Sequence, residues 1–349
     1  MTMPSNQELK KGGKPIRTIT IAIVLAIAGG IAAFAVQTFT SKSPARAVII
    51  VPENGDKAQL ADSLEKHTDS RFASRTMRAA NLMMSAFHLR PGAYEIRQGQ
   101  SAFSAARLLG RGRQYIVDMP LNNIRTREEL AEKASSRLRL SKKELLDALS
   151  DPATTKPYGL TPENAMALFI ADNYELYWNT SAEEFIKKIG ERYKRFWNAK
   201  RKSQAADLGL TPAQVAVIAS IADEESSKAD EKGRICRLYL NRLKKGMRLQ
   251  ADPTVKFALG DFSIKRVNKT HLAFGSPYNT YRTEGLPPGP IRISDPKTID
   301  SFLGSAPTSD IYMCARADFS GYHDFTADYA EHQANARRYQ EKLNQMKIK

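Results

Sequence analysis

The hydrophobic residues of this chain follow three different patterns. Between residues 18 and 36 no side chain is charged, and large aliphatic groups occur on every side of a helix. This uninterrupted stretch predicts a helix of residues 18–36 that is just long enough to span a bilayer. Beyond it, short runs of alternating residues predict strands, and apolar residues three and four apart predict amphipathic helices. We therefore expect an apolar segment followed by mixed α and β structure.

The charges before the apolar segment predict its orientation. Four basic residues are opposed by a single acid there: Lys10, Lys11, Lys14, Arg17 and Glu8. By the positive-inside rule, residues 1–17 form a cytoplasmic tail and the rest of the chain is exported. A cleaved signal peptide is the alternative, because Ala33 and Ala35, on either side of Phe34, have the small-residue pattern that a signal peptidase accepts. The apolar stretch, however, exceeds a usual signal-peptide core. Residues 37–47 are rich in Ser, Thr and Pro and predict a polar linker.

A strand, a turn and a helix recur three times after the linker. The strands are expected at residues 48–51, 94–96 and 115–117, and apolar residues at helical spacing follow the first and the third. Compact units of this kind either bind a partner or hold the next domain away from the membrane. The repeat therefore predicts a small domain without deciding its purpose.

Helices dominate the next part of the chain. Residues 138 to about 206 repeat leucine and aromatic side chains at helical spacing, with strands or loop edges expected at 166–170 and 174–178. Two further helices are predicted at residues 211–226 and 231–245, the second of them stopped by a glycine.

Three adjacent acids end the helix predicted at residues 211–226. At about 100° per residue, Glu225 shares a face with aliphatic residues, Glu224 lies on the flank, and Asp223 points to the opposite, outward side. A carboxyl group among aliphatic side chains loses hydration in its charged form, so its pKa rises toward the range where it can donate a proton near neutral pH. Glu225 is thus a candidate general acid, with a solvated acidic patch as the alternative.

Polar side chains that could hold a ligand follow in two blocks. Residues 249–255 place polar groups at alternate positions, so a strand would present them on one face. Residues 276–290 contain so many prolines and glycines that they must form a shaped loop, a common way to present amide and phenol donors. The candidate ligand-binding residues are Gln250, Asp252, Thr254, Tyr278, Asn279 and Tyr281. Each of them could instead be a turn or cap residue.

Composition narrows the choice of partner. The 349 residues have a formal net charge of +16, which suggests a partner that is anionic. Nucleic acid is disfavoured, because the basic residues are scattered and no nucleic-acid-binding motif occurs. Cys236 and Cys314 imply no disulfide framework, and the histidines at 67, 88, 271, 323 and 332 lack metal-ligand spacing. We expect no cofactor and no metal.

Four sequence blocks resemble the endolytic murein transglycosylase family, also called the YceG-like family. In chain order they are residues 241–255, 278–281, 285–291 and 323–325. The resemblance extends from the apolar segment to the carboxyl terminus. The family pattern has a catalytic glutamate within a helix, and the match to residues 220–226 places it on Glu225. Asp223 stands where the family usually has another glutamate.

The resemblance implies an α+β fold with a transmembrane helix, a LysM-like domain at 48–123 and a mixed α/β catalytic domain at 124–349. It implies cleavage of the β-1,4 bond between N-acetylmuramic acid and N-acetylglucosamine without water, which leaves a 1,6-anhydro end. The implied partners are peptidoglycan glycan strands and penicillin-binding synthases. The implied location is the cell inner membrane, crossed once, with the catalytic domain in the periplasm.

Other functions stay open at this point. A scaffold that binds the cell wall would have a ligand-binding cleft but no catalytic activity. Burying an acid costs free energy, and such a scaffold would have no need of one. A cleaved, secreted hydrolase would differ in location and would use water. A hydrolase site built on Ser226 and His323 is disfavoured, because the nucleophile-elbow motif is missing. His323 is instead expected to be a structural imidazole beside a strand at 312–315.

Overall fold

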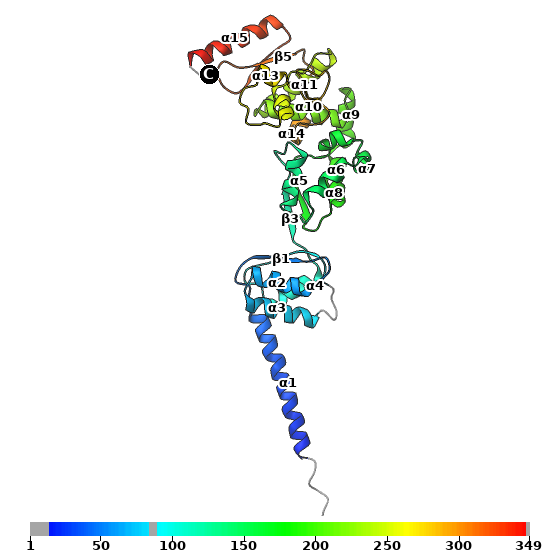
Figure 1. The fold of residues 1–349 in the computed structure, drawn as a ribbon, viewed down its shortest axis with the longest axis vertical. Coiled ribbons are helices and arrows are strands. Elements are labelled where there is room, and N and C mark those ends of the chain that lie inside the picture. The colour runs from blue at the N-terminus through cyan, green and yellow to red at the C-terminus, as the bar shows by residue number, and fades with distance from the viewer. Residues whose placement is uncertain (1–13, 84–88, 347–349) are drawn as a thin grey trace, which may run out of the picture. The chain divides into compact units, whose positions relative to one another are not determined.

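The computed structural model describes residues 14–83 and 89–346, so the predicted cytoplasmic tail lies outside it as far as residue 13. The chain forms two compact units (Figure 1), one of residues 1–116 with 177–179 and one of residues 117–176 with 180–349. The fold is mixed α and β with an apolar helix at the amino-terminal end, as expected. The LysM-like assignment and the domain bounds stay predictions.

The first unit begins with the apolar helix α1 (Lys14–Thr40). Its 23 residues from Thr18 to Thr40 have a mean hydropathy of 2.6 and are long and apolar enough to cross a membrane, a property that signal sequences share. The helix continues into the segment predicted as linker, where Thr38 is buried and Phe39 stacks on Phe103 with ring centroids 4.5 Å apart. The end of the apolar helix therefore belongs to the packed part of the unit.

The rest of the first unit is a two-stranded sheet covered by helices, which Figure 1 shows gathered beside β1. The strands are antiparallel, and their register runs from Ala47↔Ile96 to Val51↔Gly92. Alternate residues of β1 are buried, as the alternating sequence predicts. The elements are β1 (Ala47–Val51), α2 (Lys57–His67), α3 (Ser70–Met83), β2 (Gly92–Ile96) and α4 (Ala102–Arg111).

The third predicted strand and helix form, but they belong to the second unit. Strand β3 (Ile116–Pro120) pairs with β4 (Asn173–Tyr177), which confirms the strand expected at 174–178. The strand or loop edge expected at 166–170 is wrong in part, because residues Pro162–Leu168 form a 3₁₀ helix, η2. The helices around them are α5 (Arg127–Ser135), α6 (Lys142–Ser150), α7 (Pro152–Thr155), η1 (Lys156–Tyr158), α8 (Ala182–Phe196) and α9 (Ala199–Asp207).

Helix α10 (Pro212–Glu225) lies in the core of the second unit. Thr211 caps it, since its side chain accepts a hydrogen bond from Gln214 N–H at 3.3 Å while the Gln214 side chain accepts one from Thr211 N–H at 2.8 Å. Every residue from Val215 to Asp223 is buried. The helix packs against α11 (Ala229–Lys244) and α14 (Pro296–Leu303). The surrounding elements therefore fix the position of α10 on nearly all sides.

The strand expected at residues 249–255 is wrong. Helix α12 (Asp252–Leu259) begins there, with Pro253 in its first turn, where a missing N–H costs nothing. Residues 276–290 contain no helix or strand, which confirms the shaped loop. The remaining elements are α13 (Lys269–Leu272), the antiparallel hairpin β5 (Tyr312–Ala315) and β6 (His323–Thr326), and α15 (Tyr329–Gln345).

Candidate active site

Asp223 is the first of the three acids at the end of α10, and it is buried. Its carboxylate accepts hydrogen bonds from Lys232 Nζ at 2.6 Å, Thr298 Oγ1 at 2.6 Å and Asp295 N–H at 2.9 Å. The prediction that Asp223 points outward is therefore wrong. The physical reason is that α14 covers the side of α10 that a one-sided helix would expose. Asp223 joins α10, α11 and α14, which is a structural role.

Glu224 lies between two arginines. Arg125 Nη2 is 3.0 Å from its Oε1, and Arg292 Nη1 is 2.9 Å from the same atom. All three side chains are partly buried, so water screens these ion pairs less than it would on an open surface. Glu224 therefore joins Arg125 and Arg292 through ion pairs.

Glu225 differs from both neighbours because it makes no ion pair in the described part of the chain. The Tyr239 hydroxyl donates a hydrogen bond of 2.6 Å to Glu225 Oε1. The pKa of Glu225 is raised from 4.5 to about 7, mainly by burial; the charges of Asp252 and Glu224 also raise it, while the Tyr239 hydrogen bond and Lys256 lower it. The carboxyl group can therefore hold a proton near neutral pH and then release it, as the sequence predicts.

Glu225 lines a cleft of about 400 Å³ in the second unit, which we call the cleft. Gln250, Asp252 and Tyr281 of the predicted ligand-binding residues also line it. The Tyr281 hydroxyl donates to Asp252 Oδ1 at 2.6 Å, and burial raises the pKa of this phenol. The other residues of the cleft are Leu238, Tyr239, Arg242, Leu249, Ile311, Tyr312, Met313, Tyr329 and His332.

Arg242 holds one wall of the cleft together. Its guanidinium donates to the carbonyl oxygens of Arg248 at 3.0 Å and Ile311 at 2.9 Å, and to Gln250 Oε1 at 2.5 Å. Gln250 has a φ of +52°, a conformation that few residues other than glycine adopt. Its backbone N–H donates to the carbonyl of Thr280 at 3.1 Å. These bonds keep Gln250 in the strained conformation that turns it toward the cleft.

The other three predicted ligand-binding residues support the loops around the cleft and do not line it. Thr254 is fully buried, with its hydroxyl 2.8 Å from that of Thr280. The Asn279 side-chain amide donates to the carbonyls of Leu272 and Phe274 at 3.0 and 2.7 Å. The Tyr278 ring packs against Phe257, with centroids 4.6 Å apart. In the structure all three act as turn or core residues.

Sequence reasoning missed five polar or aromatic residues of the cleft. Tyr239 and Arg242 occupy the predicted inner face of α11, where Tyr and Arg among aliphatic residues were the available signal. The other three come from β5 and α15, far along the chain, and no local pattern connects them to Glu225. They are Tyr312, Tyr329 and His332.

His323 is structural, as expected. Its backbone N–H donates to Glu231 Oε1 at 2.8 Å, and its Nδ1 lies 3.1 Å from Glu231 Oε2. The Ser226 hydroxyl donates to the same carboxylate at 3.4 Å. Glu231 therefore lies between the serine and the histidine, and among the described residues no imidazole faces the hydroxyl as a base, which argues against a hydrolase triad.

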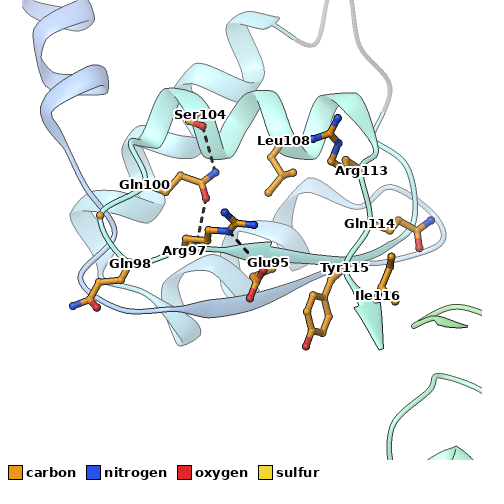
Figure 2. Close-up of a pocket in the computed structure, with 11 residues that line it drawn as sticks. Glu95, Arg97, Gln98, Gln100, Ser104, Leu108, Arg113, Gln114, Tyr115 and Ile116 are labelled. Carbon is orange, nitrogen blue, oxygen red and sulfur yellow. Dashed lines mark hydrogen bonds and ion pairs between the residues drawn. The ribbon is translucent and has the colours of Figure 1, made fainter. Parts of the chain in front are cut away.

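A second hollow, which we call the groove, lies in the first unit. It has a volume of about 800 Å³ and is formed by residues of β2, α4 and the segment that follows α4. Figure 2 shows Ser104 and Leu108 of α4 facing Glu95 and Arg97 across it. Glu95 is paired with Arg46, whose Nε lies 2.5 Å away. The groove is polar and open to solvent.

Both cysteines are free, with Cys236 buried in α11 and Cys314 partly buried in β5. Among the residues that the structure describes, no three His, Cys, Asp or Glu side chains come together as metal ligands would. His88 lies outside those residues. The chemistry available in the cleft is that of its carboxyl, phenol and guanidinium groups.

The fold and the cleft define an α and β protein whose site centres on one protonatable glutamic acid. A profile of the YceG-like family matches residues 49–338. The chain belongs to the YceG-like family.

Comparison with individual proteins agrees with this membership. The chain is 32% identical over 161 residues to an endolytic murein transglycosylase of Bacillus subtilis, which covers 46% of this chain and 44% of that protein. An endolytic murein transglycosylase of Streptococcus pneumoniae is 28% identical over 110 residues, 30% of this chain and 20% of that protein. The matches thus span less than half the length of these relatives.

A solved structure shares the fold. The crystal structure of a YceG-like protein from Listeria monocytogenes superposes with a TM-score of 0.56. It covers 83% of this chain and 98% of its own, at 22% sequence identity. At this identity the likeness shows the fold alone.

Proposed function

We propose that this protein is a membrane-anchored endolytic transglycosylase of peptidoglycan, which cleaves the bond between N-acetylmuramic acid and N-acetylglucosamine and leaves a 1,6-anhydro end. The observation that carries the proposal is the carboxyl group of Glu225, whose pKa is raised to about 7 in a cleft lined by polar and aromatic side chains. The names of the relatives from Bacillus subtilis and Streptococcus pneumoniae support the same reaction.

The first step needs an acid. Protonated Glu225 transfers its proton to the glycosidic oxygen, and the bond to the anomeric carbon breaks as N-acetylglucosamine leaves with a restored hydroxyl. Positive charge develops on the muramoyl ring, and the 2-acetamido group of the substrate itself shields it, as in substrate-assisted glycosidases. Tyr239 donates to Glu225 Oε1 and fixes the carboxyl group for this transfer.

The second step needs a base. Glu225, now a carboxylate, removes the proton from the muramoyl 6-hydroxyl, whose oxygen bonds to the anomeric carbon and closes the anhydro ring. The proton returns to Glu225, so the enzyme regains its starting state and no water is consumed. A single carboxyl group with a pKa near the working pH can perform both steps.

Gln250, Asp252 and Tyr281 are the proposed sugar-binding residues, because they line the cleft with Glu225. Arg242 positions Gln250 through their hydrogen bond of 2.5 Å. Thr254, Tyr278 and Asn279 are proposed to act indirectly, by shaping the loops that hold these groups.

The location is part of the proposal. Helix α1 contains an apolar span of 23 residues, which supports a single-pass anchor in the cell inner membrane with a cytoplasmic amino terminus and a periplasmic catalytic unit. The first unit, proposed to be LysM-like, would hold or position the glycan near the membrane. Nascent glycan strands and the penicillin-binding synthases that make them are the proposed partners.

Mass spectrometry of released muropeptides tests the reaction. Purified peptidoglycan is treated with the full-length protein or with the Glu225→Gln variant, which keeps the shape of the side chain but cannot donate a proton. We expect products ending in 1,6-anhydromuramic acid from the wild type and none from the variant.

Other products would contradict the proposal in distinguishable ways. Reducing ends would indicate a hydrolase that uses water. If the folded wild type released nothing from either sacculi or freshly polymerised strands, the protein would be a wall-binding scaffold. Equal activity of the variant would remove Glu225 from the mechanism.

A further inference from the structure

Three aromatic rings meet at one wall of the cleft. Tyr312 from β5 stacks on His332 from α15, with ring centroids 5.1 Å apart and planes inclined by 18°. Tyr329, the first residue of α15, lies 5.5 Å from Tyr312 and 6.3 Å from His332. All three line the hollow that contains Glu225. Helix α15 packs beside the β5–β6 hairpin (Figure 1), so it forms part of the site wall.

The exposure of Tyr329 differs from that of a packing residue. Tyr329 is 57% exposed although it touches two other rings. A ring that served only to fasten α15 to the hairpin would be covered, because burial is what makes such contacts stabilising. An exposed aromatic face rimmed by polar groups is instead typical of a binding surface.

The three rings form a surface that suits an uncharged face of a ligand. Burial, together with the nearby charge of Arg242, lowers the pKa of His332, so its ring is neutral at neutral pH. The Arg242 guanidinium lies 6.0 Å from the Tyr312 ring centre, and both side chains line the cleft. A neutral aromatic surface attracts the C–H face of a pyranose ring, while the hydroxyl groups at the sugar's edge reach polar neighbours.

We infer that Tyr312, Tyr329 and His332 form a stacking platform that binds one pyranose ring of the glycan beside the scissile bond. This inference rests on the proposed function for the nature of the ligand. It assigns to α15 a share in substrate binding, with Tyr329 as the exposed contact residue.

Glycan binding by full-length protein that also contains Glu225→Gln tests the platform, because the strand then stays intact. The probe is purified peptidoglycan glycan strands from which the stem peptides have been removed. Tyr329→Ala is expected to weaken binding about tenfold, the effect of losing roughly 1.4 kcal/mol of contact. Tyr329→Phe keeps the ring and is expected to bind as tightly as the parent.

Tyr339→Ala is the matched control on the same helix. Tyr339 contacts Phe319, with centroids 5.8 Å apart, and does not line the cleft. We expect its removal to leave glycan binding unchanged. In the active protein, Tyr329→Ala is expected to raise KM with little change in kcat, because the platform holds the sugar equally in the ground state and the transition state.

The outcomes separate this inference from the proposed function. If Tyr329→Ala binds as well as the parent, or if Tyr339→Ala weakens binding as much, the platform is wrong while anhydro products can still support the reaction. If the parent binds no glycan strand at all, the platform is also wrong. A wild type that makes no anhydro products would overturn the reaction, whatever the binding shows.

Discussion

The groove of the first unit is about twice as large as the cleft of the second, at about 800 against 400 Å³, yet only the cleft is equipped for acid–base chemistry. Each contains a glutamate. Glu95 in the groove is paired with Arg46, which is 59% exposed, so its charge is stabilised by an ion pair and by water. Glu225 in the cleft has a phenol as its hydrogen-bond donor and is partly shielded from water.

The comparison shows that the surroundings of a carboxyl group, and not the size of the hollow that contains it, determine whether the group can donate a proton near neutral pH. A carboxylate that is paired with a cation on an open surface keeps the solvation of its charged form. A carboxyl group that is buried beside one neutral donor keeps its proton until near neutral pH. The two glutamates therefore provide a matched pair for mutation.

The largest expected effect comes from removing each carboxylate in turn. Glu225→Gln is expected to reduce turnover of peptidoglycan by about 1,000-fold or more, since the proton donor is lost. Glu95→Gln is expected to change turnover by less than about twofold, because its ion pair is on an open surface. Release of anhydromuropeptides over time measures both. Comparable losses in the two variants would contradict the distinction.

A smaller effect is expected from the donor to Glu225. Tyr239→Phe removes the hydrogen bond that lowers the pKa of Glu225, so that pKa should rise above about 7. We expect the wild-type value of kcat/KM to decline as the pH rises through about 7, and this decline to move to higher pH in the variant. Turnover should fall about tenfold as the carboxyl group loses its orientation.

Tyr115→Phe is the control for this change. Tyr115 lines the groove and accepts a hydrogen bond of 3.2 Å from Arg46, so it also loses a polar contact. Its pH profile should match that of the wild type. If kcat/KM of Tyr239→Phe declines at the same pH as that of the wild type, the Tyr239 hydroxyl does not lower the pKa of Glu225.

The smallest expected effect concerns stability. The folded-state pKa of Glu225 is raised from 4.5 to about 7, so its contribution to stability is fully present below pH 4.5 and is lost as the pH rises through about 7. Glu225→Gln cannot ionise and is not subject to this loss. Between pH 5 and pH 8 the variant should therefore gain about 2 kcal/mol relative to the wild type.

Urea unfolding of the protein at both pH values measures this gain. Glu95→Gln is the control, because it also removes a carboxylate, one that is paired with the exposed Arg46. A constant difference between Glu225→Gln and the wild type over this pH range would mean that Glu225 is hydrated in the folded protein.

Much of α10 could be predicted from sequence because its signals are local. Thr211 before Pro212, with Gln214 two residues further on, is a capping arrangement that begins a helix almost regardless of its surroundings. The apolar run behind it leads directly to Glu225. The direction of Asp223 could not be predicted in the same way, because a helix covered on nearly all sides has no outward face.

Two parts of the cleft could not be predicted from local sequence patterns. Alternating polar residues at 250, 252 and 254 suggested a strand, but Asp252 followed by Pro253 begins a helix, a signal that outweighs alternation over so few residues. The aromatic residues of α15 reach the cleft only through packing against the β5–β6 hairpin. That contact joins distant parts of the chain, and single-sequence periodicity carries no information about it.

Glu225 is the last residue of α10, and this position has a consequence of its own. The peptide dipoles of a helix add up to a partial negative charge at its carboxyl end, which disfavours a further negative charge there. In the proposed mechanism, the carboxylate formed after the first proton transfer lies at this unfavourable place. The dipole of α10 would then favour the return of a proton to Glu225 at the end of the proposed reaction.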